Sequence, residues 1–255
     1  MTGPERIAAA FANSGKRAAL MPYLMGGFPD MEASKQIGLA YADGGADLVE
    51  LGIPFSDPLA DGPVIHAAGT AALKAGATTG AVLGVCEALA PRVAVVVMCY
   101  ANLVLARDDF PARIAAAGAS GLIVPDLPLE EAPPLLDACD AAGVALVPLV
   151  APTTPDARLR AIGQRARGFI YTVSVTGTTG ERDALSETFA ATVQRARQHA
   201  DVPVALGFGI ATPEHAAQAA AAGADGVIVG SRLVRAAAEG EDVRGLVESM
   251  ARALR

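Results

Sequence analysis

Two carboxylates joined by a proline-rich loop are the residues of this chain best placed to do chemistry. Residues 50–63 read Glu-Leu-Gly-Ile-Pro-Phe-Ser-Asp-Pro-Leu-Ala-Asp-Gly-Pro, so Glu50 ends an apolar run and Asp61 follows on a stiffened loop. An acid at a strand end and another on the next loop can face each other across a pocket, where burial and repulsion separate their pKa values. A solvated acidic turn is the alternative. Because an unpaired charge inside an apolar strand is costly, acid–base chemistry is favoured.

Three glycine-bearing turns further along the chain could hold an anion. They are Thr-Gly-Thr-Thr-Gly at 176–180, Gly-Phe-Gly-Ile at 207–210, and Gly-Ser at 230–231. Glycine lets backbone N–H groups approach an anion closely, and the helix expected after residue 230 adds the positive end of its dipole. These turns predict a phosphorylated substrate. The chain lacks both the G-x-x-x-x-G-K-[ST] motif and the dinucleotide fingerprint, which argues against ATP or a dinucleotide.

Aromatic and sulfur-containing side chains gather near the expected strand ends and predict an apolar slot for an aromatic ligand. Simple packing at the strand ends explains them equally well, so both interpretations stay open. The residues concerned are Tyr23, Met98, Tyr100, Tyr171 and Phe208.

Other reactive residue types argue against metal, Schiff-base and thiol chemistry. The histidines, His66, His199 and His215, share no metal-ligand spacing. No lysine lies late in an expected strand, so an aldolase of the Schiff-base type lacks its nucleophile. Cys99 does end a strand, but no histidine is near it in sequence, which favours a role in core packing.

Charge and cysteine content exclude several classes of protein. The 255 residues include 20 basic and 27 acidic side chains, a net charge of −7 with no basic stripe, which argues against nucleic acid as the main partner. Three cysteines without C-x-x-C spacing argue against a disulfide framework and against a zinc site. They predict a protein of a reducing compartment. The first residues lack the continuous apolar stretch of a signal peptide, and runs such as Val93–Met98 are too short to span a bilayer. We therefore expect a cytoplasmic protein with no membrane partner.

Short apolar runs separated by alanine-rich segments of helical period are the elements that must position these residues. Uninterrupted apolar runs are typical of parallel strands that are buried on both faces. Strands are predicted at 18–25, 46–51, 93–99, 121–124, 144–150, 169–173, 202–206 and 226–229, with helices at 31–43, 133–142 and 213–222 among others.

A weak repeat at the joints from helix to strand supports one architecture. An alanine–glycine pair or its near equivalent recurs there, and glycine can end a helix in the left-handed conformation. Eight strands alternating with helices predict an α/β fold, a single (β/α)8 TIM-barrel domain over residues 1–255, with a doubly wound open sheet as the competitor. An extra helix at 4–14 could close the bottom of the barrel. The longest steps follow strands two and six, so long loops lie where barrel enzymes carry their active sites.

The acid loop, the glycine turns and the aromatic set together resemble the alpha subunit of tryptophan synthase over essentially the whole chain. The most specific matches are 50–63, Tyr-Ala-Asn at 100–102, Val-Pro-Asp-Leu-Pro at 124–128, and Gly-Phe-Gly-Ile at 207–210. The resemblance implies a lyase of tryptophan biosynthesis that splits indole-3-glycerol phosphate into indole and glyceraldehyde 3-phosphate. That reaction is a retro-aldol cleavage with no metal or organic cofactor in this chain.

The resemblance also implies a role for each matching residue. Glu50 would be the acid–base group, and Asp61 would accept a hydrogen bond from the indole N–H. Thr179 would interact with Asp61 when the loop after strand six closes and excludes water. The implied phosphate positions are Gly180, Gly209, Gly230 and Ser231, and the implied indole slot is Tyr23, Met98, Tyr100, Tyr171 and Phe208.

A pyridoxal-phosphate-dependent beta subunit is the partner that the resemblance implies, in an α2β2 complex through which indole would pass by a tunnel. The pyridoxal phosphate (PLP) would belong to that partner. The partner would dock near the 52–63 loop, which contains Pro54 and Asp57, and near Asn102. Asp126 is interpreted either as an acid that orders its loop or as a contact to a neighbouring loop.

Two residues depart from the family pattern, and two other functions stay open. Val175 replaces a basic residue found in some members, and His66 replaces the usual glutamine. Another phosphate-binding barrel, such as an isomerase or synthase, would share the later turns but would not explain the acid loop. A mainly regulatory subunit, which activates its partner while cleaving little itself, is left open by Val175.

Overall fold

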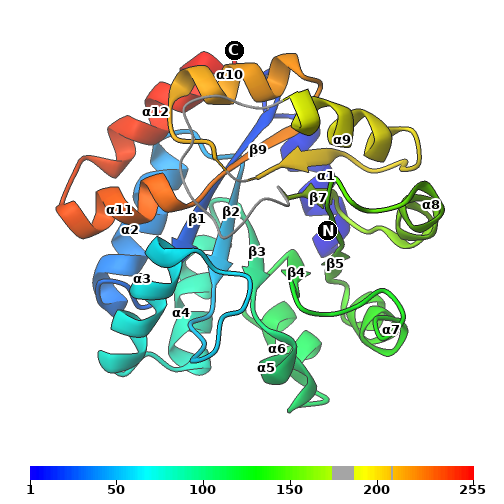
Figure 1. The fold of residues 1–255 in the computed structure, drawn as a ribbon. Coiled ribbons are helices and arrows are strands. Elements are labelled where there is room, and N and C mark those ends of the chain that lie inside the picture. Colours follow the sequence, from blue (N-terminus) through cyan, green and yellow to red (C-terminus); the bar gives the residue numbers. More distant parts are fainter. Residues whose placement is uncertain (174–186, 208) are drawn as a thin grey trace.

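Parallel strands form a nearly closed barrel at the centre of the molecule (Figure 1). The computed structural model describes residues 1–173, 187–207 and 209–255. Within these residues every strand pairing is parallel, and the order is β5-β4-β3-β2-β1-β9-β8-β7-β6. The predicted barrel is confirmed and the open sheet is wrong. β5 and β6, the strands at the two ends of this order, follow each other directly in the chain, so the sheet returns to its starting point. The strands are β1 (Ala19–Met25), β2 (Leu48–Gly52), β3 (Ala94–Met98), β4 (Gly121–Ile123), β5 (Ala145–Val147), β6 (Leu149–Val150), β7 (Ile170–Thr172), β8 (Val204–Leu206) and β9 (Gly226–Val229).

One strand of the barrel is divided by a proline. The segment predicted as a continuous strand at 144–150 forms β5 and β6, which Pro148 separates, so that part of the prediction is wrong. Proline has no N–H to donate to a neighbouring strand. Its carbonyl is still used, since it accepts the N–H of Tyr171 at 3.0 Å. β5 pairs with β4 and β6 pairs with β7, so the ring is joined across this residue.

Helices cover the outside of the barrel, as the alternating pattern predicts (Figure 1). The helices predicted at 31–43 and 133–142 have those bounds, and the third ends one residue early, at Ala221. The helices after the first are α2 (Met31–Asp43), α3 (Pro63–Lys74), α4 (Thr79–Leu89), α5 (Ala101–Leu105), α6 (Phe110–Ala116), α7 (Pro133–Ala142), α8 (Asp156–Arg165), α9 (Glu187–Arg197), α10 (Pro213–Ala221), α11 (Ser231–Glu239) and α12 (Val243–Ala253).

The long step from β2 to β3 contains two helices besides the acid loop. Pro63 occupies the first turn of α3, where its missing N–H is not needed and its fixed φ suits the helix. Gly62 precedes it as the N-cap residue. The acid loop is therefore confined to residues 53–62, and most of the extra length that we attributed to a loop is helical.

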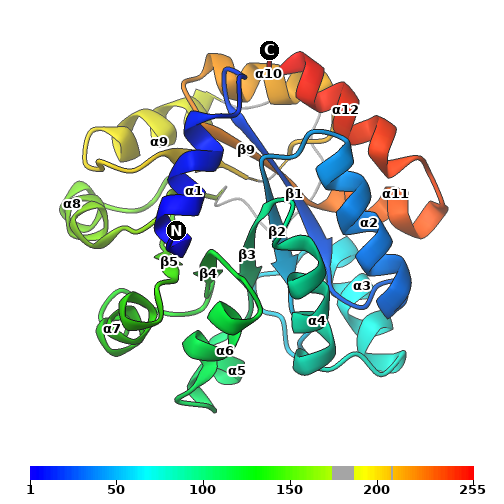
Figure 2. The same cartoon turned by 180° about the vertical axis from the view of Figure 1, so that it is seen from behind.

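The first helix, α1 (Gly3–Ala12), lies across the end of the barrel opposite the carboxyl ends of the strands (Figure 2). Ile7 is fully buried there with barrel side chains such as Met21 and Ile228. The ring of Phe11 packs against Phe169 with centroids 5.7 Å apart. The expectation that an N-terminal helix closes the bottom of the barrel is confirmed.

Glycines at the joints from helix to strand take the left-handed conformation that the repeat predicts. Gly118, Gly143 and Gly223 have φ values of 83°, 71° and 93°. At the first joint Gly45 adopts this conformation, with φ 94°, while Gly44 before it stays helical. An L-residue with a Cβ is disfavoured at such φ values, so each glycine turns the chain into the next strand.

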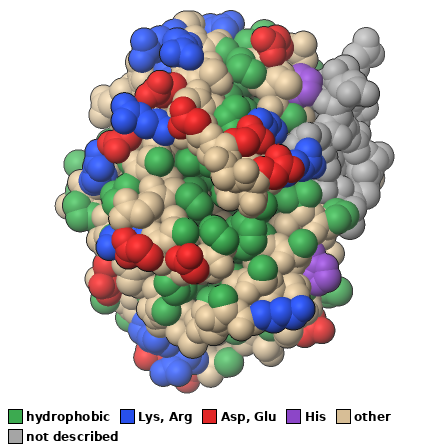
Figure 3. Space-filling model, turned by 90° about the vertical axis from the view of Figure 1, so that its left-hand side faces the viewer, with side chains coloured by type: hydrophobic (Ala, Val, Ile, Leu, Met, Phe, Trp, Pro, Cys, Tyr) green, Lys and Arg blue, Asp and Glu red, His purple; other side chains and the backbone are tan. Residues whose placement is uncertain are grey.

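Opposite charges are mixed on one face of the molecule, and the three thiols are buried. On the face that Figure 3 displays, Lys and Arg side chains are interspersed with Asp and Glu rather than gathered in a stripe. Cys86, Cys99 and Cys139 are free and buried, and Cys99 packs in the core as predicted. Among the helices that the structure describes, none is both long and apolar enough to cross a membrane.

Candidate active site

Strand β2 carries Glu50 into the barrel interior, on the side where the strands have their carboxyl ends. Its neighbours in register are Tyr23 on β1 and Val96 on β3, and it is only 2% exposed. Among the described residues its Oε2 atom has no hydrogen-bond partner. Burial, and to a smaller extent the charge of Asp61, raises the pKa of Glu50 to about 8. This carboxyl is therefore mostly protonated at neutral pH and can donate a proton.

The acid loop brings Asp61 to the same pocket and is held there by Tyr100, which follows β3. The Tyr100 hydroxyl donates to Asp61 Oδ1 at 2.8 Å and accepts the N–H of Ala60 at 3.1 Å. The ring of Phe55 stacks on that of Tyr100, with centroids 5.3 Å apart. One tyrosine thus fixes the loop through its hydroxyl and its ring.

Asp61 is less deeply buried than Glu50, and its surroundings act in both directions. Burial raises the pKa of Asp61 above its ordinary value, while the hydrogen bond from Tyr100 and the nearby His66 lower it. His66 itself is exposed on the first turns of α3. Glu50 is the more deeply buried of the two acids, and its burial favours the protonated form that a proton donor requires.

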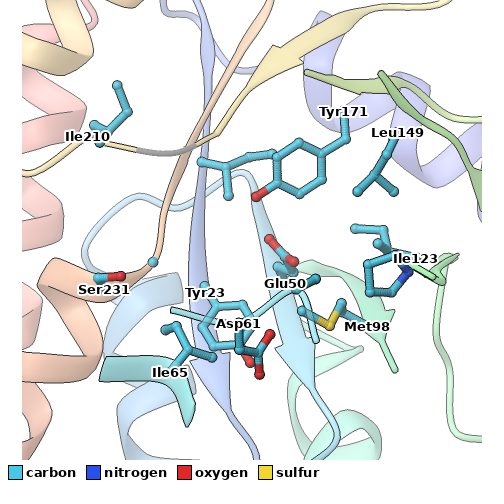
Figure 4. Close-up of a pocket in the computed structure, with 15 residues that line it drawn as sticks. Tyr23, Glu50, Asp61, Ile65, Met98, Ile123, Leu149, Tyr171, Ile210 and Ser231 are labelled. Atoms are coloured by element: carbon cyan, nitrogen blue, oxygen red, sulfur yellow. The ribbon is translucent and has the colours of Figure 1, made fainter. Parts of the chain in front are cut away.

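These two acids face a pocket at the carboxyl ends of the strands, whose empty space is about 740 Å³ including the part open to solvent (Figure 4). Tyr171 projects toward Glu50 from the opposite side. The predicted residues that line the pocket are Tyr23, Glu50, Asp61, Met98, Tyr171, Gly209, Gly230 and Ser231.

The lining changes in character from one side of the pocket to the other. In Figure 4, Ser231 lies on one side, Glu50 in the middle, and Met98, Ile123 and Leu149 on the opposite side. Ser231 is the first residue of α11, whose N-terminus carries the positive end of the helix dipole. The pocket therefore offers an anion site, then carboxyl groups, then an apolar wall.

Glycines let the aromatic rings lie close to the neighbouring strand ends. The ring of Tyr23 lies against Gly52, and that of Tyr171 against Gly207, so closely that a Cβ at either glycine would overlap the ring. Gly209 has φ +80°, which allows the turn after β8 to bend around the pocket. Small residues at these positions keep the slot open for a flat ligand.

Several predicted residues lie outside the pocket lining. Tyr100 sits behind Asp61 rather than on the wall, and Asp126 accepts the N–H of Ala101 at 2.8 Å, which orders the start of α5. Pro54 is buried, while Asp57 and Asn102 are exposed near the mouth of the site. Val175, Thr179, Gly180 and Phe208 fall outside the described residues.

Sequence reasoning missed most of the apolar wall. Ile123 ends β4 and Ile228 lies one residue before the end of β9, so both could have been found from those positions. Leu149 begins β6 after Pro148, and Ile65 lies on the unpredicted helix α3. The remaining missed residues are Ala60, Pro125 and Ile210. Within the described part of the chain, no group of three His, Cys, Asp or Glu side chains is arranged to hold a metal ion.

Comparison with known proteins gives a close match over nearly the full length. The family model for the tryptophan synthase alpha chain matches residues 10–253. The tryptophan synthase alpha chain of Gloeobacter violaceus is 47% identical over 241 residues, which cover 92% of this chain and 87% of that protein. The chain belongs to the tryptophan synthase alpha chain family. The resemblance inferred from the acid loop and the glycine turns is confirmed.

Solved structures of tryptophan synthase have the same fold. A chain of the Mycobacterium tuberculosis enzyme superposes with a TM-score of 0.91 at 39% identity, covering 98% of this chain and 97% of that one. A chain from the α2β2 complex of Pyrococcus furiosus gives 0.85 at 36% identity, covering 94% and 98%. As a tryptophan synthase alpha chain, the protein is a lyase that cleaves indole-3-glycerol phosphate in tryptophan synthesis, and the rival phosphate-binding barrel is wrong.

Proposed function

We propose that Glu50 is the acid–base group of the cleavage reaction and that Asp61 stabilises the indole ring as its electrons shift. The observation that supports this most strongly is the burial of Glu50, with a pKa raised to about 8, in the pocket that Asp61 also lines. A neutral carboxylic acid can donate a proton at pH 7, and an anionic one can take it back.

Glu50 alone can give and take every proton that moves in the cleavage reaction. The protonated carboxyl gives its proton to indole C3, which converts the ring into an indolenine with a positive charge shared by its nitrogen. The carboxylate so formed removes the proton from the hydroxyl on the adjacent side-chain carbon. That carbon becomes the aldehyde of glyceraldehyde 3-phosphate, the C–C bond breaks, and its electron pair restores the indole ring. Glu50 ends the cycle protonated.

Asp61 and Tyr100 would act together on the nitrogen side of the ring. Asp61 accepts the indole N–H, and this hydrogen bond strengthens as positive charge develops on nitrogen. The contact from the Tyr100 hydroxyl leaves the second oxygen of Asp61 for the substrate. Stacking of Phe55 on Tyr100 supports the same arrangement, because it fixes the ring that holds the acid.

The phosphate of the substrate would lie at the other side of the pocket. Gly209, Gly230 and Ser231 line it there, and the N-terminus of α11 favours an anion. The indole would occupy the slot between Tyr23, Met98 and Tyr171. The roles proposed for Thr179, Gly180 and Phe208 rest on the sequence, since these residues are outside the described part.

We further propose a PLP-dependent beta subunit as partner, in an α2β2 complex. The Pyrococcus furiosus relative comes from such a complex. Apolar side chains stand exposed beside the site, with Leu59 on the acid loop 87% and Leu105 on α5 60% exposed. Exposed apolar residues near a site mouth favour a protein contact. In this proposal the present chain works as one domain in the cytoplasm and holds no cofactor, and the PLP belongs to the partner.

The deciding experiment measures indole release from indole-3-glycerol phosphate by the purified chain, with and without a beta subunit. We expect slow release that rises strongly when the partner is added. Absence of release under both conditions would remove the proposed mechanism. If a Glu50→Gln chain activated the partner as well as wild type while wild type itself cleaved almost nothing, the regulatory interpretation would be favoured instead.

A further inference from the structure

His215 lies at the start of α10, directly behind the turn that forms one side of the pocket. It is the third residue of the helix and is 7% exposed. Its Nδ1 atom accepts the N–H of Ala211 at 3.3 Å, while its own backbone N–H donates to Thr212 Oγ1 at 3.2 Å. The imidazole ring is therefore the acceptor of a backbone hydrogen bond from the residue just before the N-cap of the helix.

The hydrogen bond to Ala211 fixes one end of the segment that carries Gly209 and Ile210. Both of these residues line the pocket, and Gly209 needs the left-handed conformation that only glycine adopts easily. The other end of the segment is anchored where Gly207 donates its N–H to the carbonyl of Thr172 on β7, at 3.1 Å. Gly209 and Ile210 thus lie between a backbone hydrogen bond at Gly207 and the imidazole contact at Ala211.

We propose that His215 is a positioning residue, which holds Gly209 where its backbone meets the phosphate of the substrate. Donors that are already oriented bind an anion without paying for reorganisation, and small displacements of such groups weaken binding strongly. The proposal rests on the phosphate role given above to Gly209. His215 itself touches the turn and not the ligand.

A purely structural role for His215 is the competing explanation. Thr212 Oγ1 caps α10 by accepting the backbone N–H of His215, and His215 Nδ1 accepts the N–H of Ala211 just before that cap. A cap of this kind would stabilise α10 and would change the melting temperature. It would not distinguish ligands that carry a phosphate from ligands that do not.

The test compares two ligand fragments on the full-length chain. Glycerol 3-phosphate carries the phosphate without the ring, and its inhibition constant is measured in the cleavage assay. Indole carries the ring without the phosphate, and its fluorescence can be titrated because the chain has no tryptophan. The variants are His215→Leu, which removes the acceptor, and His215→Asn, whose Oδ1 can replace Nδ1. His199→Leu, in the turn after α9, is the matched control.

We expect His215→Leu to raise both the KM for indole-3-glycerol phosphate and the inhibition constant of glycerol 3-phosphate about tenfold. The Kd for indole should stay within about twofold, and His215→Asn should restore phosphate binding to within about threefold of wild type. If the leucine variant does not fold, His215→Ala replaces it in the same measurements. His199→Leu should behave as wild type in every assay.

Three results would overturn the role of His215 while leaving the reaction itself intact. The inhibition constant of glycerol 3-phosphate could stay unchanged in the leucine variant, indole binding could weaken equally, or the asparagine variant could fail to restore binding. A wild-type chain that does not bind glycerol 3-phosphate would have a different meaning. It would remove the phosphate assignment of Gly209 first, and the role of His215 with it.

Discussion

The two ends of the barrel interior are filled in opposite ways. At the lower end, opposite the carboxyl ends of the strands, α1 inserts Ile7 and Phe11 among apolar side chains, and Phe11 contacts the ring of Phe169. At the upper end the same interior holds Glu50, a buried carboxyl whose Oε2 has no partner among the described residues. Burying a polar group without a partner costs stability, whereas burying an apolar one adds to it. The lower end thus stabilises the fold, and the upper end keeps a reactive acid at some cost.

Glu50→Gln should produce the largest effect, a loss of activity without a loss of stability. Loss of an acid–base group typically lowers the rate about 10² to 10⁴-fold, with a greater loss when the group serves two steps. Stability at neutral pH should not fall, because the amide carries no charge to bury. The matched control is Glu87→Gln, an exposed residue on α4. Indole release and thermal unfolding are the two measurements, and wild-type turnover by the Glu50→Gln variant would contradict the mechanism.

Ile7→Ala should show the reverse pattern at the lower end. Truncation of a fully buried isoleucine costs about 2 to 5 kcal/mol of unfolding free energy. At temperatures where the variant stays folded, kcat should remain close to that of wild type, because Ile7 is at the end of the barrel away from the pocket. Denaturant titration checks the loss, with exposed Leu105→Ala as control. A large fall in kcat without a loss of stability would break the contrast between the two ends.

Tyr100→Phe tests how the acid loop is held, with a smaller expected effect. The variant loses the hydrogen bonds to Asp61 and Ala60, so kcat/KM should fall about tenfold. Since the tyrosine hydrogen bond lowers the pKa of Asp61, its removal should raise that pKa and shift the acidic limb of the pH profile upward. Tyr41→Phe is the control, because Tyr41 is a buried tyrosine on α2. An unchanged profile would mean that the hydroxyl does not set the state of Asp61.

The smallest expected effect is the change of wild-type kcat/KM with pH near neutrality. Glu50 must start protonated, so kcat/KM should be about half its maximum near pH 8 and should fall further above it. The raised pKa also has a stability consequence, because the folded protein retains a proton that the unfolded chain loses. The unfolding free energy contributed by Glu50 is therefore full below about pH 4.5 and decreases up to about pH 8. Relative to wild type, Glu50→Gln should gain stability over that interval, as unfolding at pH 5 and pH 8 would reveal.

The strands and the acid pair could be predicted because both leave a local signature. Parallel strands buried on both faces are uninterrupted apolar runs, and Glu50 stood out as a charge within one of them. Asp61 could be linked to it because the loop between them is short and rich in proline. These inferences needed the identity of neighbouring residues and little knowledge of long-range contacts.

Features that depend on contacts distant in sequence could not be predicted in this way. Pro63 looked like part of the stiffened loop, yet it begins α3 and brings Ile65 to the pocket. Pro148 was hidden inside an apolar run, although it divides the strand. For Tyr100, sequence places the residue at a strand end but does not determine its direction, and the structure turns it behind Asp61.

The pairing of β1 with β9 has a consequence for how the protein is made. The register joins Ala19 to Gly226, so one flank of the first strand is covered only by residues synthesised roughly 200 positions later. At about 5 to 20 residues per second, the ribosome needs about 10 to 40 seconds to supply them. Throughout that time the nascent β1 presents unpaired backbone groups, which other chains can bind as an edge. A chain that terminates before residue 226 is therefore expected to aggregate, however complete its catalytic loop is.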